Sequence, residues 1–178
     1  MGNLVQTEKP NQMATITLSG NEIHTVGSLP EVGSQAPDFE LLKDDLSTTT
    51  LADFKGSRVV FNIFPSIDTD VCATSVRNFN KRATDLENTK VVSVSRDTPF
   101  ALKRFTKDED TNNVMNLSDI RTGEFGESYG LTIVDGPFEG FHSRAVVVVD
   151  ENGKVIYNQQ VPEIGQEPDY LEALKSLL

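Results

Sequence analysis

The chain contains a single cysteine, Cys72, in a setting that favours reactivity. The β-branched and aromatic run Arg58–Phe64 is a predicted strand that stops at Pro65, since proline cannot donate to a central ladder. From Val71 onward, apolar residues recur every three or four positions, which is the spacing of an amphipathic helix. Cys72 is therefore expected in the first turn of a helix. Free N–H groups and the positive end of the helix dipole favour a thiolate there over a thiol.

An inert packing role is the alternative for Cys72, because free cysteines often behave as small buried hydrophobes. The helical spacing places Cys72 beside the apolar stripe rather than on it, and the residue follows the polar turn Asp68–Asp70. Position alone leaves a reactive and a structural cysteine about equally open.

Strands and helices alternate along the rest of the chain. Strands are predicted at Thr15–Leu18, Glu22–Val26, Phe39–Lys43, Thr48–Leu51, Arg58–Phe64, Lys90–Ser95, Val114–Leu117, Arg144–Asp150 and Lys154–Gln160. Helices are predicted from Val71 to Leu86, from Pro99 to about Lys107, from Thr122 to Tyr129 and from Pro168 to Leu178. This order predicts an α/β domain whose largely parallel sheet is covered on both faces, with an antiparallel hairpin at its end. Residues 1–12 are expected to form a flexible tail and residues 13–178 a single domain.

The composition restricts the partners of the chain. It has 27 acidic and 16 basic residues, a formal net charge of -11. Nucleic acids and anionic membranes bind proteins through concentrated lysine and arginine, so neither is expected as a partner. No apolar run approaches the length of a membrane span, and the polar N-terminal residues lack the apolar stretch of a signal peptide. A lone cysteine cannot form an intrachain disulfide, which fits a reducing compartment and predicts a cytoplasmic protein.

No metal or cofactor is expected. His24 and His142 are isolated in the sequence, whereas zinc and iron sites need several ligands close together. Each histidine is interpreted as a surface or packing residue. A glycine-rich phosphate loop is also missing from the sequence.

Pro65, Thr69 and Cys72 reproduce the Pro-x-x-x-Thr-x-x-Cys signature of peroxiredoxins. Their surroundings resemble the bacterial thiol peroxidase branch of that family, and the likeness extends in order through nearly everything after the first dozen residues. The matching segments are Asn62–Thr69, Val71–Arg77, Asp97–Ala101, Arg104–Phe105, Asn112–Val114, Asp135–Pro137, Arg144–Asn152 and Glu167–Tyr170.

The resemblance implies a thioredoxin-like fold, with a central mixed sheet flanked by helices and an N-terminal β-hairpin extension. It implies a homodimer as the usual assembly. Hydrogen peroxide and organic hydroperoxides would be the substrates, and a thioredoxin-like protein or a low-molecular-weight thiol the reductant. Cys72 would attack the peroxide and become a sulfenic acid. Thr69 would hydrogen-bond the thiolate and the peroxide, Arg144 would supply positive charge to both, and Pro65 would shield the thiolate from water.

Two of these residues have simpler interpretations. Thr69 could serve only as a helix cap, a common position for threonine. Arg144 could be an ordinary residue at the start of a strand, although its permanent charge suits a thiolate and a departing oxygen anion. Arg77, five residues into the helix, is interpreted as structural.

The chain departs from the family pattern at Thr106. Relatives typically carry a second, resolving cysteine at this position, directly after Arg104 and Phe105. A hydroxyl cannot condense with a sulfenic acid to form a disulfide. We therefore expect a one-cysteine cycle in which an external thiol resolves the oxidised Cys72.

Three other functions remain open. Asp68 and Asp70 resemble the nucleophile motif of haloacid dehalogenase-like phosphatases, but that chemistry needs the first aspartate at the strand end. Cys72 and Ser75 form a Cys-x-x-Ser pair that is compatible with monothiol disulfide exchange, while dithiol cycling is excluded. A protein without a resolving cysteine could also be a redox sensor, relay or binding module with little turnover.

Overall fold

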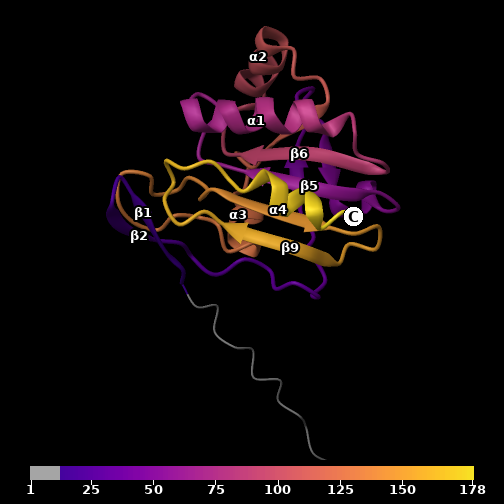
Figure 1. Ribbon diagram of the computed structural model, residues 1–178. Coiled ribbons are helices and arrows are strands. Elements are labelled where there is room, and N and C mark those ends of the chain that lie inside the picture. The colour runs from indigo at the N-terminus through magenta and orange to yellow at the C-terminus, as the bar shows by residue number, and fades with distance from the viewer. Residues whose placement is uncertain (1–12) are drawn as a thin grey trace, which may run out of the picture.

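A seven-stranded sheet forms the centre of the fold, and a separate two-stranded hairpin lies at one side (Figure 1). The computed structural model describes residues 13–178, so the predicted tail at residues 1–12 lies outside the described residues. The sheet order is β4-β3-β7-β6-β5-β8-β9. Its strands are β3 (Glu40–Leu42), β4 (Thr48–Thr50), β5 (Arg58–Ile63), β6 (Thr89–Ser95), β7 (Val114–Ser118), β8 (Ala145–Val149) and β9 (Val155–Gln160).

The sheet is mixed, and the expectation of a largely parallel sheet is wrong. Only the β5–β6 and β6–β7 pairs are parallel, whereas β3–β4, β3–β7, β5–β8 and β8–β9 are antiparallel. Parallel neighbours need a crossover connection, and helices supply one after β5 and after β6. β8 instead runs back along β5 in the opposite direction, which brings the start of β8 beside the end of β5.

Helices cover both faces of this sheet. They are α1 (Asp70–Ala83), α2 (Pro99–Glu109), α3 (Glu124–Ser128) and α4 (Tyr170–Lys175), with a short 3-10 helix at Leu51–Phe54. α1, α2 and α4 contribute to one buried cluster, and α3 contributes to the cluster on the opposite face. Figure 1 shows α1 and α2 together on one side of the strands and α3 on the other.

Local sequence signals account for the start of α2. The Thr98 hydroxyl accepts a hydrogen bond from the Ala101 amide at 3.3 Å, and Pro99 occupies the first turn. Proline is well tolerated there because its missing N–H would have had no helical partner. This element therefore begins where its sequence predicts.

The N-terminal hairpin consists of β1 (Thr15–Leu18) and β2 (Asn21–His24), which confirms the predicted extension. Ser19 and Gly20 form its turn with φ of 51° and 80°, the positive values that a tight two-residue hairpin loop needs. One face of the hairpin is apolar and packs on the body of the protein: Ile16 and Ile23 join Ile133 and Ile164 in a third buried cluster.

Close packing at Gly126 makes a first prediction. A Cβ at this position in α3 would lie 2.8 Å from Nε2 of His142, closer than ordinary van der Waals contact. Gly126→Ala is expected to lower the free energy of unfolding by about 1–3 kcal/mol, because overpacking forces neighbours to shift. Urea denaturation would measure the change, with Ser128→Ala at the exposed end of the same helix as the control. Equal stability of the two variants would contradict the packing argument.

Candidate active site

Cys72 lies in the first turn of α1, as predicted, but it is completely buried. The expectation that it lies beside the apolar stripe is wrong: it belongs to the same buried cluster as Phe64, Ile67 and Val76. Phe64 and Ile67 come from the segment between β5 and α1, so that segment closes the apolar cluster around the first helical turn. A thiol in such a place meets water and other proteins only when the segment moves.

A buried hydrogen-bond chain fixes this turn of α1 to the sheet. The Ser75 hydroxyl donates to the Cys72 carbonyl at 2.7 Å. The side-chain amide Nδ2 of Asn62, in β5, donates to the Ser75 hydroxyl oxygen at 3.0 Å. Asn62 and Ser75 are both fully buried. The position of the cysteine main chain is therefore set by β5 rather than by the helix alone.

Arg144 lies directly before β8, the strand that pairs with β5 on the side away from β6, and its side chain reaches Cys72. Ala145 stands opposite Ile63 in the antiparallel β5–β8 pair, so Arg144 arrives at the edge where the segment leading to Cys72 leaves β5. Its Nη2 donates to Cys72 Sγ at 3.4 Å, and its Nε donates to the Ile164 carbonyl at 2.8 Å.

The guanidinium of Arg144 is a buried charge, with only 2% of the residue exposed. No carboxylate lies within salt-bridge distance of it among residues 13–178, and its Nη1 has no hydrogen-bond partner there. A buried cation is costly without a counter-charge, and a thiolate at Cys72 would supply one. The free Nη1 is a donor that is available to a bound oxygen.

Pro65 and Thr69 lie in the segment that leads from β5 to Cys72. Thr69 occupies the N-cap position of α1 but makes no side-chain cap, so the interpretation as a mere cap is not supported. Its hydroxyl donates to the Ser66 carbonyl at 3.0 Å rather than to the cysteine sulfur. Because the proton is used in this way, the Thr69 oxygen is free to accept a hydrogen bond. Pro65 is buried.

Asp97 holds the segment between β5 and α1 in place, a role that sequence reasoning missed. Its carboxylate accepts hydrogen bonds from the Ser66 hydroxyl at 2.8 Å, the Ile67 amide at 2.7 Å and the Ser95 hydroxyl at 2.6 Å. The Ser118 hydroxyl donates to the Asp97 carbonyl. One residue therefore connects the carboxyl ends of β6 and β7 with the segment that covers Cys72. The only sequence signal for Asp97 was its place in Asp97–Ala101, one of the segments that resemble the thiol peroxidase branch.

Comparison with known proteins gives this geometry a context. A family model described as Redoxin matches residues 31–174. The thiol peroxidase of Mycobacterium tuberculosis (strain ATCC 25618 / H37Rv) is 53% identical over 165 residues, which cover 93% of this chain and 99% of the relative. The chain belongs to the redoxin family. These matches confirm the resemblance to the thiol peroxidase branch.

Solved structures confirm the thioredoxin-like fold of this redoxin. The peroxiredoxin-like protein from Aquifex aeolicus is 39% identical with a TM-score of 0.86, over 92% of this chain and 96% of that one. The thiol peroxidase from Chromobacterium violaceum has a TM-score of 0.84 at 21% identity, over 90% and 94% of the two chains. The second likeness supports the fold alone. Within residues 13–178, no helix has the length and apolar character needed to cross a membrane.

Both histidines of this redoxin pair with aspartates, which the sequence did not reveal. His142 and Asp119 are fully buried and 2.8 Å apart, and Asp119 also accepts hydrogen bonds from the main chain at the start of α3. His142 is two residues before Arg144, so the pair of His142 and Asp119 helps to fix the main chain that leads into β8. At the surface, the hydrogen bond between His24 and Asp135 raises the pKa of the histidine and lowers the pKa of the aspartate.

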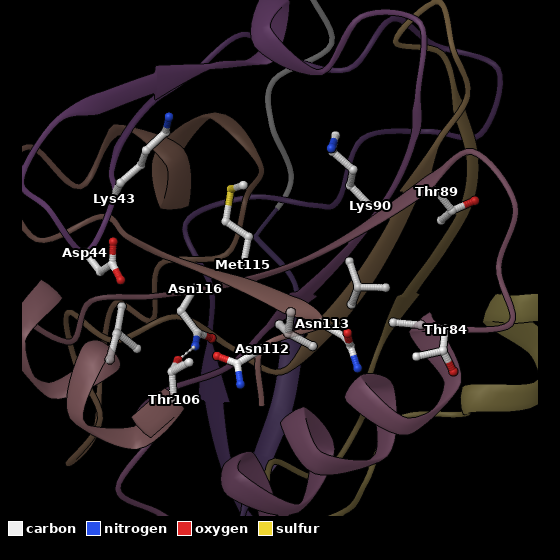
Figure 2. Close-up of a pocket in the computed structure, with 14 residues that line it drawn as sticks. Lys43, Asp44, Thr84, Thr89, Lys90, Thr106, Asn112, Asn113, Met115 and Asn116 are labelled. Atoms are coloured by element: carbon white, nitrogen blue, oxygen red, sulfur yellow. Dashed lines mark hydrogen bonds between the residues drawn. The ribbon is translucent and has the colours of Figure 1, made fainter. Parts of the chain in front are cut away.

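Thr106, at the usual position of the resolving cysteine, lies in the last turns of α2. Its hydroxyl accepts a hydrogen bond from the Asn116 amide at 2.9 Å (Figure 2). Both residues line a groove of about 530 Å³ beside Val91 and Val114, near the amino ends of β6 and β7. Cys72 follows the carboxyl end of β5, which is parallel to β6. Asn116 is in register with Asn62 of β5 through Ser93 of β6, so position 106 packs over β7, two strands away from β5.

The two aspartates of the phosphatase-like motif do not form a site in this structure. Asp68 and Asp70 are exposed, and Asp68 forms an ion pair with Arg104 at 3.0 Å instead of standing at the strand end. Ser75 is buried and its hydroxyl donates to the Cys72 carbonyl, so it holds the helical turn, and the monothiol hypothesis depends on Cys72 alone. Arg77 forms a bidentate ion pair with Glu109, which agrees with the interpretation of Arg77 as a structural residue.

The contact between Arg144 and Cys72 makes a second prediction. In Arg144→Lys, one ammonium cannot reach both the Ile164 carbonyl and the sulfur as the forked guanidinium does. The rate of alkylation of Cys72 by iodoacetamide at neutral pH is expected to fall about tenfold, because alkylation requires the thiolate. Arg77→Lys, which alters an exposed pair, is the control and should react like the unmodified protein. An unchanged alkylation rate in Arg144→Lys would contradict a role for Arg144 in the reactivity of Cys72.

Proposed function

We propose that Cys72 is the nucleophile of a thiol-dependent peroxidase that reduces hydrogen peroxide and organic hydroperoxides. The observation that carries the proposal is the 3.4 Å approach of Arg144 Nη2 to Cys72 Sγ inside a buried cluster. An arginine that has no carboxylate partner among residues 13–178 would favour a thiolate and could bind a peroxide oxygen at the same time. The curated relatives named thiol peroxidase confirm the class of activity, an oxidoreductase that acts on peroxides with a thiol as reductant.

In the proposed first step, the Cys72 thiolate attacks one oxygen of the peroxide. An S–O bond forms as the O–O bond breaks, the sulfur is oxidised to sulfenic acid, and the other oxygen leaves as water or an alcohol after taking a proton. The free Nη1 of Arg144 is a donor for the charge that develops on the leaving oxygen. Thr69 Oγ1 can accept the peroxide O–H because its own proton is bound to Ser66. Pro65 excludes water from the thiolate.

In the proposed second step, an external thiol resolves the sulfenic acid. Its sulfur attacks Cys72 Sγ, water leaves, and a mixed disulfide forms. A second thiol then attacks that disulfide and releases the Cys72 thiolate. The reductant is a low-molecular-weight thiol or a cysteine of a thioredoxin-like protein, since the chain holds no second cysteine. The segment over Cys72 has to open before either reductant can reach the sulfur.

We also propose a domain organisation, a compartment and an oligomeric state for this protein. Residues 13–178 would act as one domain, because the hairpin shares a buried cluster with Ile133 and Ile164, which lie just before β8 and just after β9. A reducing compartment, the cytoplasm, would keep the external thiols available. We expect a homodimer, for which the exposed rings of Phe100 and Phe141 offer apolar surface.

A redox sensor or relay is the second candidate function. The complete burial of Cys72 favours it, because a sulfenic acid behind a closed segment would persist longer than an exposed one. Sensor and enzyme share the oxidation step and differ in whether a reductant completes the cycle.

Stopped-flow kinetics test the first step. The reduced protein is expected to consume hydrogen peroxide or cumene hydroperoxide at least about a hundredfold faster than free cysteine, since preorganised donors contribute about that much. Cys72→Ser is the control and should show no reaction. Rates equal to those of free cysteine would contradict the peroxidase and place the sensor or a binding function first.

Intact mass spectrometry tests the one-cysteine cycle. After one equivalent of peroxide, the protein is expected to gain one oxygen atom and to form a dimedone adduct at Cys72, without losing two hydrogens. Added thiol should convert this species to a mixed disulfide and then to the reduced protein. An oxidised product that thiols cannot reduce would argue against turnover and favour an end-point sensor.

A further inference from the structure

The main chain that holds Arg144 is a short stretch near the C-terminus, residues 161–165. The Ile164 carbonyl accepts the hydrogen bond from Arg144 Nε at 2.8 Å. The Val161 amide donates to the Arg144 carbonyl at 2.9 Å. The orientation of the guanidinium therefore depends on where this stretch, here called the support loop, is placed.

The N-terminal hairpin places the support loop. The Thr17 amide of β1 donates to the Pro162 carbonyl at 2.8 Å, and the Ile164 amide donates to the Thr17 carbonyl at 3.0 Å. β1 thus adds a short parallel bridge to the loop at Glu163, although the two segments are far apart in sequence (Figure 1). Side-chain packing acts in the same direction, because Ile164 is buried against Ile16 and Ile23.

Glu163 is the side chain that clamps the two segments together. One carboxylate oxygen accepts a hydrogen bond from the Gly20 amide in the hairpin turn at 2.8 Å, and the other accepts from the Gly165 amide at 2.9 Å. These main-chain donors lower the pKa of Glu163 below its ordinary value. The carboxylate is therefore ionised at neutral pH and binds the turn and the loop at once.

We propose that Glu163 and the β1–β2 hairpin are positioning elements for the catalytic arginine. They hold the Ile164 carbonyl, that carbonyl holds Arg144 Nε, and Arg144 then directs Nη2 at Cys72. The inference rests on the proposed role of Arg144 at Cys72 and extends it to a part of the chain that does not contact the sulfur. The Nη2–Sγ distance of 3.4 Å leaves little room for displacement, so a small movement of the support loop weakens the contact.

Glu163→Ala tests this directly. The rate of Cys72 alkylation by iodoacetamide, and the rate of peroxide reduction, are expected to fall about three- to tenfold. Asp45→Ala is a matched control, because Asp45 also binds a main-chain amide, that of Ser47 at 2.9 Å, but in the β3–β4 hairpin. The control should change neither rate. Ile16→Ala, which loosens the same loop through packing, should lower both rates in the same direction.

A double-mutant cycle separates positioning from a general loss of structure. If Glu163 acts through Arg144, then Glu163→Ala should have almost no further effect on the rates in an Arg144→Lys background. The same fold-change in both backgrounds, or no change in the Glu163 single variant, would overturn the proposal. Alkylation does not involve peroxide, so the positioning role can be judged even if the protein proves to be no peroxidase.

Discussion

The contact between the Arg144 guanidinium and the Cys72 sulfur is the interaction on which the rest of the site depends. Both groups are removed from water, and each would be costly to bury in charged form without the other. The thiolate proposed at Cys72 would therefore offset the buried charge of Arg144. In the proposed reaction, the unpaired Nη1 of Arg144 would bind an oxygen of the peroxide beside the sulfur.

The sheet brings these two residues together although they are 72 positions apart in the chain. The cysteine segment leaves β5 at its carboxyl end, and Arg144 lies at the same edge, directly before the antiparallel β8. Two sets of supports then fix the pair. Asp97 holds the segment between β5 and α1 that precedes Cys72. The hairpin and Glu163 hold the support loop, whose Ile164 carbonyl binds Arg144.

In the proposed cycle, the burial of Cys72 keeps water away from the sulfur and also hinders its reduction by an external thiol. A closed apolar cluster keeps water and unwanted thiols from Cys72, yet an external reductant has to reach the same sulfur. Thr106 cannot take over this task, since a hydroxyl cannot form a disulfide. The hydrogen bonds of Asp97 and the exposed ion pair of Asp68 with Arg104 are among the polar contacts that an opening of the segment would break or stretch.

By itself, the sequence determined the element types, the place of Cys72 at a helix start, the Pro65–Cys72 signature and the lack of a second cysteine, because these depend on local spacing and residue identity. Only the tertiary structure decided that β8 runs antiparallel to β5 and that Cys72 is fully buried. It also assigned the supporting roles of Asp97, Asp119 with His142, and the Ile164 carbonyl. Such contacts join residues about 20 or more positions apart, and a main-chain carbonyl has no sequence signature at all. They become visible only once the strands are paired.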